Sequence, residues 1–443
     1  MKFIKPLYLT SFFFAWTWAV VFIFILGYFF PLFLFIGKIS LITLILLFLA
    51  DIFILFKYSN GIFARRETPN RLSNGDENEI KIYLENLYPF KLGVKIIDEI
   101  PVQFQIRNFQ HSTILSPGEN KIITYFLRPV KRGEYNFGFI NIYASSPLNL
   151  VSKRYKFFGD KSVPVYPSYI QMRKYELHAI SSTLTEIGIK KIRKIGHSTE
   201  FEQIKEYVNG DDFRSINWKA TARRNELMVN NYDEEKSQQV YSVINMGRVM
   251  KMPFKGLSLL DYAINTSLVI SNIAVKKQDK AGIVTFSNKV NSILPADNRS
   301  SQMLKILELL YRQNTDFLES DYESLCASLL AKITHRSLMI LYTNFETIEG
   351  LKNQLPFLRR LSASHLVLVI IFENTELKSL LEMDPKNTEE IYLKTIGEKF
   401  AFEKRQIVKE LNRYKINSIL TPPEKLSVNT INKYLEFKAR GLI

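Results

Sequence analysis

The sequence predicts a chain of three parts: a membrane helical hairpin, then an all-β sandwich, then an α/β doubly wound domain. Three observations support this prediction. Apolar residues dominate from Leu7 to Phe56, residues from about 70 to 170 alternate in polarity with a period of two, and strand-like and helix-like segments alternate from Gln239 onward. At 443 residues the chain is long enough for two domains with cores beside the membrane segment.

Residues 1–60 are expected to form a two-helix transmembrane anchor. Leu7–Gly37 contains no charged residue, and the apolar run after Lys38 is interrupted only by Asp51. A single helix over the uncharged stretch would be about 46 Å long, well beyond a hydrocarbon core of roughly 30 Å. We therefore expect a turn near Gly27–Pro31 or near Gly37–Lys38. A cleaved signal peptide is disfavoured because no small-residue cleavage site follows the first run.

The distribution of basic residues predicts the orientation of this anchor. Basic residues precede the first span and follow the second: Lys2, Lys5, Lys57, Arg65, Arg66 and Arg71. Only Lys38 lies between the spans, so the positive-inside rule places both termini and the soluble domains on the cytoplasmic side of the inner (plasma) membrane. Asp51 is expected to reach water or a neighbouring helix near the interface, and a proton relay is the alternative.

The composition favours a membrane surface over nucleic acid as a partner. The net charge of +16 fits an anionic lipid surface, whereas no nucleic-acid-binding motif organises the basic residues. Cys326 is the single cysteine, which excludes disulfides within the chain. Its helical, apolar context predicts a small buried core residue rather than a catalytic thiol.

Residues 61–170 are expected to form a β-sandwich-like domain. Short period-two segments punctuated by turns indicate strands at Asn78–Glu85, Lys121–Leu127, Tyr135–Tyr143 and Val163–Tyr166. We expect a spacer or docking module, because no cluster of ligand-type side chains occurs in it. Residues 171–235 are expected to be a linker followed by a charged signature segment.

Residues 236–443 are expected to form the α/β domain. Strands are predicted at Val240–Ile244, Ala281–Phe286, Val290–Leu294, Leu338–Tyr342, Leu366–Phe372 and Ile416–Leu420. Helices are predicted at Leu257–Val275, Ser300–Arg312, Tyr322–Lys332, Glu398–Tyr414 and Lys425–Ala439. Ligands of such sheets bind at the carboxyl ends of the strands, which here means the loops after Ile244, Tyr342 and Phe372.

The charged signature carries a family resemblance. Its residues are Phe201, Glu206, Tyr207, Gly210, Asp211, Asp212, Arg214, Ile216, Trp218, Lys219, Ala222 and Arg223. This spacing resembles the signature of the domain of unknown function 58 family, and the order of membrane hairpin, β-rich segment and α/β domain is similar to that family over nearly the whole chain. The resemblance implies a von Willebrand factor type A-like domain and an association with MoxR-type AAA ATPases.

The type A fold that the resemblance implies holds a metal ion through an Asp-x-Ser-x-Ser loop, a threonine and a later aspartate. The matching positions in this chain are Asn245, Gly247, Val249, Thr315 and Asn344. Two carboxylates and both loop hydroxyls are missing, and Mg²⁺ needs oxygen ligands that offset its dehydration. We therefore expect a degenerate site without a cofactor, unless Thr315 and Asp316 together restore Mg²⁺ binding.

The signature itself has two interpretations. The first is a structural network between domains, formed by Gly210, Asp211, Asp212, Arg214, Trp218, Lys219 and Arg223. In this interpretation Tyr207, Ile216 and Trp218 form an apolar anchor among paired charges. The second interpretation is an unrecognised hydrolase or transferase that uses the Asp211/Asp212 pair.

The favoured function is that of a membrane-anchored adaptor or scaffold and not of an enzyme. The five histidines are scattered, and the sequence has no P-loop, zinc motif or nucleophile elbow. Through the resemblance, the expected partner is a MoxR-type AAA ATPase acting in assembly or remodelling of envelope complexes. The alternatives are the hydrolase or transferase and a basic lipid-surface module.

Overall fold

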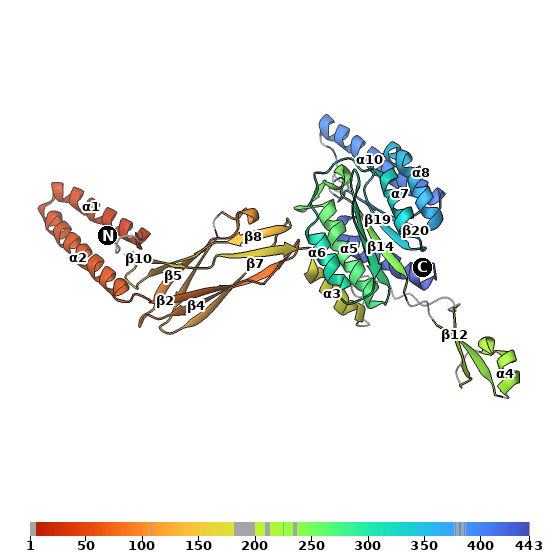
Figure 1. Cartoon of the computed structure of the whole chain (residues 1–443). Coiled ribbons are helices and arrows are strands. Elements are labelled where there is room, and N and C mark those ends of the chain that lie inside the picture. The colour runs from red at the N-terminus through yellow and green to blue at the C-terminus, as the bar shows by residue number, and fades with distance from the viewer. Residues whose placement is uncertain are drawn as a thin grey trace. The chain divides into compact units, whose positions relative to one another are not determined.

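The computed structural model describes residues 6–442 except 108, 181–199, 209–212, 225, 234–236, 376, 378–380, 382–384 and 386. The chain divides into two compact units, Met1–Tyr166 and Pro167–Ile443 (Figure 1). The membrane hairpin and the β-sandwich form the first unit together. The sandwich, expected to extend to residue 170, ends with its last strand at Tyr166.

The membrane hairpin consists of helices α1, Ser11–Phe29, and α2, Pro31–Lys57. The chain turns at Phe30, which confirms the first of the two expected turn positions, and α2 runs unbroken through the second. Gly27 allows close approach at this turn, because a Cβ there would lie 2.9 Å from the backbone nitrogen of Leu34. Both helices are long and apolar enough to cross a membrane.

Three sheets form the described part of the β-sandwich. The five-stranded sheet contains, in order, β1 (Leu7–Leu9), β10 (Val151–Phe157), β9 (Ile140–Ser145), β5 (Leu92–Asp98) and β6 (Gln110–Leu115). The second sheet contains β2 (Ile62–Glu67), β4 (Asn78–Asn86) and β7 (Asn120–Leu127). The third contains β3 (Leu72–Ser73), β11 (Lys161–Tyr166) and β8 (Gly133–Phe137). Alternate residues such as Ile80, Ile82 and Leu84 of β4 are buried in the core, as period-two strands require.

The prediction of one strand in the sandwich is wrong. The segment Tyr135–Tyr143 was predicted as one strand, but it forms the end of β8 and the start of β9, which belong to different sheets. The break falls at Gly138, whose backbone nitrogen donates to Glu99 O at 2.9 Å. A side chain at Gly138 would lie against Glu99, so the crossing between the sheets needs a glycine here.

Asp51 joins the membrane hairpin to the β-sandwich. Its carboxylate accepts hydrogen bonds from the Ser146 hydroxyl and from the backbone N–H groups of Leu150 and Val151, the last two at 3.0 and 2.8 Å. The residue is completely buried, so the expectation that it reaches water is wrong. Three donors from the sandwich satisfy the carboxylate instead of solvent, as a buried charge requires.

The end of α2 is fixed by the same domain. Lys153 Nζ donates to the carbonyl oxygen of Tyr58 at 2.7 Å, and the Tyr88 hydroxyl donates to that of Leu55 at 2.7 Å. A cation and a hydroxyl therefore satisfy carbonyl groups that a helix C-terminus leaves without partners. Before α1, strand β1 pairs with β10, so the sandwich holds both ends of the hairpin.

The second unit is built on a six-stranded sheet in the order β18-β17-β14-β19-β20-β21. The strands are β14 (Gln239–Asn245), β17 (Lys280–Phe286), β18 (Val290–Asp297), β19 (Leu338–Tyr342), β20 (Leu366–Phe372) and β21 (Asn417–Thr421). All are parallel except β18, which runs antiparallel to β17. The first strand, β14, lies in the middle, and successive connections run to either side of it. The carboxyl ends of β14 and β19 therefore border the place where ligands of open sheets bind.

Helices cover both faces of this sheet (Figure 1). One face carries α5 (Leu259–Lys276), α6 (Gln302–Tyr311) and α11 (Leu426–Ala439). The other carries α7 (Tyr322–Lys332), α8 (Ile348–Ser364) and α10 (Thr388–Arg413). Side chains of β14 alternate between the two layers, with Tyr241 and Val243 in the core beneath α7 and α8. The alternation of strands and helices is confirmed, and the von Willebrand factor type A-like assignment stays a prediction.

Two further segments of the second unit precede its sheet. The linker predicted from residue 171 begins instead with helix α3, Tyr169–Ile180, which packs against α5. The signature segment forms a hairpin of β12, Glu200–Glu206, and β13, Met228–Asp233, with helix α4, Trp218–Arg224, between them.

We predict that replacing Asp51 by asparagine destabilises the first unit. The new amide group places a donor where three donors of the sandwich already point, so one of these hydrogen bonds is lost. The full chain in detergent should therefore lose about 1–3 kcal/mol of unfolding free energy. The measurement is the thermal unfolding midpoint of the purified protein. Asp160→Asn changes an exposed aspartate of the same unit and should leave the midpoint unchanged. Equal midpoints for Asp51→Asn and the unmodified chain would contradict the role of this contact.

Candidate functional site

The carboxyl ends of β14 and β19 carry two residues of the expected metal site. Asn245 ends β14, and Asn344 follows β19 after Thr343. Both asparagines are buried, at 0% and 5% exposure, because the strands before them are covered by helices on both faces. The sequence-based placement of these two residues at one edge of the sheet is therefore consistent with the structure.

The Asn245 side chain has every hydrogen-bonding position occupied. Its Oδ1 accepts from the Gly247 backbone at 2.8 Å and from the Ser320 hydroxyl at 2.7 Å. Its Nδ2 donates to Thr343 Oγ1 at 3.0 Å and to the Tyr322 hydroxyl at 3.3 Å. A carboxamide has two acceptor and two donor positions, so a metal ion would have to break one of these contacts.

The network extends to the loop between α6 and α7. The Tyr322 and Thr343 hydroxyls are 2.6 Å apart, and burial raises the pKa of Tyr322 to about 12. Thr315 Oγ1 donates to Met246 O at 2.8 Å and accepts from Phe317 N at 3.1 Å. The structure therefore brings Thr315 to the Asn245 loop, as the degenerate site requires, but its hydroxyl is used within the protein.

Gly247 and Val249, the remaining positions of the expected loop, are explained by the backbone conformation there. A side chain at Gly247 would overlap the Ser320 hydroxyl, so the close approach of these segments requires glycine. Val249 lies in the 3₁₀ turn Arg248–Met250. Arg248 forms an exposed ion pair with Glu319 at 3.2 Å.

Asn344 is separate from this network and contacts a lysine. Its Oδ1 accepts a hydrogen bond from Nζ of Lys404, a residue of α10. Burial lowers the pKa of Lys404 to about 8, although Glu346 favours the charged form. Lys404 could not be recognised from the sequence, because lysines are common along the charged helix α10 and the depth of this one depends on how α10 packs beside β21.

A cavity of about 710 Å³ opens beside Asn344 and Lys404. Its walls come from the loops after β19 and β20, from α10 and from the segment before α5. Most of its lining is apolar, including Phe254, Phe372, Leu377, Phe400 and Leu420. Its charged lining residues are Glu346, Glu373, Lys404 and Arg405. An apolar cavity with a few polar groups at this end of an open sheet is typical of a binding site.

The polar side chains of this edge are engaged in contacts within the protein, and the expected absence of a metal ion stays a prediction. In the part of the chain that the structure describes, no group of three or more His, Cys, Asp or Glu side chains is placed to hold one. Asn245 and Thr315 use their oxygen atoms in contacts with the protein, and an ammonium group already lies against Asn344. Asp316, which with Thr315 was the alternative that could restore Mg²⁺ binding, belongs to no such group among the described residues.

The signature hairpin is described only in part. Gly210, Asp211 and Asp212 lie outside the described residues, so neither the paired-charge interpretation nor the catalytic one is tested. The side chains of Arg214, Lys219 and Arg223 are exposed, and Trp218 is 69% exposed. The apolar anchor between domains expected at Tyr207, Ile216 and Trp218 stays a prediction.

Local contacts explain the shape of this hairpin. Asn217 Oδ1 accepts from Ala220 N at 3.1 Å at the start of α4, and its Nδ2 donates to Asn230 at 2.7 Å. Met228 and Val229 are the buried apolar side chains of β13, and Met228 N donates to Thr221 at 3.0 Å. These contacts hold α4 against β13.

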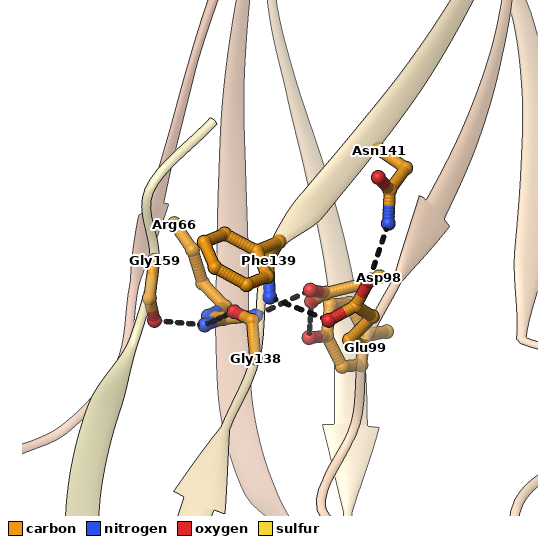
Figure 2. Close-up of polar contacts among 8 residues, drawn as sticks. Arg66, Asp98, Glu99, Gly138, Phe139, Asn141 and Gly159 are labelled. Atoms are coloured by element: carbon orange, nitrogen blue, oxygen red, sulfur yellow. Dashed lines mark hydrogen bonds and ion pairs between the residues drawn. The ribbon is translucent and has the colours of Figure 1, made fainter. Parts of the chain in front are cut away.

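A second polar cluster lies inside the β-sandwich (Figure 2). Arg66 pairs with Asp98 and also donates to the carbonyl groups of Gly138, at 2.8 Å, and Gly159. The second oxygen of Asp98 accepts from the Tyr125 hydroxyl. Burial raises the pKa of Asp98, and Arg66 opposes this change.

The neighbouring residue, Glu99, extends this cluster. Its carboxylate accepts from Phe139 N at 2.9 Å and from Asn141 Nδ2 at 2.8 Å. The Arg66 and Asp98 side chains are 2% and 0% exposed, so substrate has no access to them. We interpret the cluster as a structural tie across the sandwich, which the sequence pattern did not reveal because its members are far apart along the chain.

Comparisons with solved structures give weak likenesses that cover about a quarter of the chain. The CARDB domain of the PF1109 protein from Pyrococcus furiosus has a TM-score of 0.18 and 18% identity, covering 24% of this chain and 86% of that domain. The PapD-like domain 7 of human CEP192 has a TM-score of 0.19 and 15% identity, covering 25% of this chain and 88% of that domain. At such scores these likenesses carry no argument.

Comparisons at the sequence level reach more of the chain. Over 261 residues the chain is 23% identical to the uncharacterized protein YeaD of Bacillus subtilis (strain 168), which covers 57% of this chain and 63% of YeaD. Residues 203–402, which contain most of the signature hairpin and the sheet edge with Asn245 and Asn344, match the model of the family described as protein of unknown function DUF58. Over residues 203–402 the chain is similar to the DUF58 family, in agreement with the resemblance of the signature residues.

Proposed function

We propose that this chain is a membrane-anchored adaptor whose second unit binds a protein partner at the carboxyl-end edge of its sheet without a bound divalent ion. The observation that carries the proposal is the combination of a fully hydrogen-bonded Asn245 with a mainly apolar cavity beside Asn344. The first feature disfavours a metal ligand role. The second offers a surface for apolar groups of another protein.

The two apolar helices support the membrane part of the proposal. Because basic residues flank both outer ends of the hairpin, we place the soluble parts on the cytoplasmic side of the inner membrane. The proposed partner is a MoxR-type AAA ATPase, and the proposed process is assembly or remodelling of envelope complexes. The support for this partner is the family resemblance of the signature residues.

The adaptor proposal predicts that co-purification depends on the cavity. Phe400 lines the cavity at 44% exposure, whereas Phe402 of the same helix is 56% exposed and lies outside the lining. Phe400→Asp should therefore remove a protein partner that co-purifies with the full chain from mild detergent, because a charge enters an apolar contact. Phe402→Asp is the matched control and should retain it.

Mass spectrometry of the purified complexes gives the measurement. The proposal expects an AAA ATPase among the proteins that Phe400→Asp loses and Phe402→Asp keeps. Partners that are equally abundant with both variants would contradict a binding role for this edge.

The same proposal predicts that the sheet edge does not bind divalent ions. Calorimetric titration of the full chain with Mg²⁺ and with Mn²⁺ should give no binding signal, because the oxygen atoms of Asn245 and Thr315 are already used. Asp316→Asn serves as the comparison, since Asp316 is the nearest carboxylate in sequence to Thr315. Micromolar binding that disappears in Asp316→Asn would contradict the metal-free adaptor.

A further inference from the structure

Lys404 places a positive charge in the wall of a mainly apolar cavity. Its ammonium donates to the Asn344 side chain, a neutral amide. Among the described residues it forms no ion pair, and Glu346 acts on it only over a longer distance. The protein therefore compensates this charge only in part, because none of the described residues places an anion in direct contact with the ammonium.

We propose that the partner bound at this edge inserts a single acidic side chain, aspartate or glutamate, that pairs with the Lys404 ammonium inside the cavity. This inference rests on the proposed function and adds the chemistry of the group that is recognised. An ammonium that contacts only a neutral amide can pair with a carboxylate without first releasing another anion. The resulting charge-assisted hydrogen bond is stronger than a neutral one.

The rest of the lining restricts what surrounds this acidic side chain. Phe254, Leu377, Phe400 and Leu420 offer apolar contacts, so the residues beside the carboxylate should be apolar. Glu346 and Glu373 belong to the same lining and would repel a run of several acidic residues. The favoured occupant is therefore one carboxylate flanked by apolar side chains, presented by a protein segment.

The lowered pKa of Lys404 agrees with this geometry. Burial removes water from the ammonium and reduces the pKa to about 8, which means that the charged form is held at a free-energy cost in the unbound protein. A carboxylate would offset that cost on binding. Residues held at such a cost are often retained for function, since replacing them stabilises the fold.

The probes for the test are two capped peptides, N-acetyl-Leu-Asp-Leu-amide and N-acetyl-Leu-Asn-Leu-amide. Their binding to the full chain in detergent micelles is measured by saturation-transfer NMR. The aspartate peptide should bind at least about tenfold more tightly than the asparagine peptide, because a hydrogen bond between charged groups contributes more than a neutral one. Equal affinities would overturn the inference.

Variants assign the effect to Lys404. Lys404→Met and Lys404→Gln should both abolish the preference for the aspartate peptide, and the glutamine can still donate to Asn344. Lys409→Met removes an exposed lysine of the same helix and should keep the preference. The melting temperature of Lys404→Met should equal or exceed that of the unmodified chain, which shows that the variant is folded. A preference that persists in both Lys404 variants would overturn the inference.

The pH dependence gives an independent prediction. Binding needs the ammonium form, so affinity for the aspartate peptide should fall as the pH rises from about 7 to about 9.5, through the lysine pKa near 8. The other charged groups of the lining are Glu346, Glu373 and Arg405. Affinity for the aspartate peptide that does not change with pH would contradict the role of Lys404.

Two further arms separate the outcomes. Octanoate is offered as a small apolar acid. Lys404-dependent binding of octanoate without binding of the aspartate peptide would identify a small-molecule site and overturn the proposal that a protein segment is bound.

The co-purification experiment is repeated with Lys404→Met, which should lose the partner as Phe400→Asp does. If Lys404→Met keeps a partner that Phe400→Asp loses, the adaptor stands and the lysine inference fails. If neither variant loses a partner, the adaptor itself fails.

Discussion

The hydrogen bonds of Asn245 determine the chemistry of the sheet edge in the second unit. One carboxamide connects the end of β14 to Thr343 after β19, to Tyr322 of α7 and to Ser320 before that helix. Because the amide uses both donors and both acceptors, it joins four segments through hydrogen bonds. An aspartate here would bring a buried negative charge that a cation must offset, and the neutral asparagine removes that requirement.

The same edge still contains a cation, although it comes from a side chain. Lys404 reaches Asn344 from α10, and its ammonium faces a cavity rather than a carboxylate of the protein. A fixed ammonium differs from a divalent ion in carrying one charge and in having no open coordination positions. This edge is therefore suited to pairing with one acidic group, and the apolar walls around it favour a partner that also buries apolar surface.

In the first unit, buried polar contacts likewise connect the two apolar helices to the sandwich. Asp51, a charged residue within an apolar helix, is satisfied by donors of the β-sandwich, while Lys153 and Tyr88 satisfy the carbonyl groups at the end of α2. In both units a buried polar side chain connects elements that are distant in sequence. These contacts fix the sandwich to the hairpin, so the two apolar helices and the sandwich belong to one compact unit.

The sequence predicted elements best where burial alone decides the structure. The apolar runs Leu338–Tyr342 and Leu366–Phe372 match β19 and β20, because strands covered on both faces need continuous apolar residues. Helix α8, Ile348–Ser364, was missed, since Pro356 and several polar residues obscure its apolar stripe. Asn245 and Asn344 could be placed from strand ends, but the partner of each depends on tertiary packing that no local pattern records.

The most direct test of this account is anomalous diffraction from crystals of the chain grown with Mn²⁺. The account predicts no anomalous peak between Asn245 and Asn344, and an Asn245 amide that keeps its contacts with Ser320 and Thr343. A manganese ion bound at this edge, with the Asn245 or Thr315 oxygen among its ligands, would contradict it.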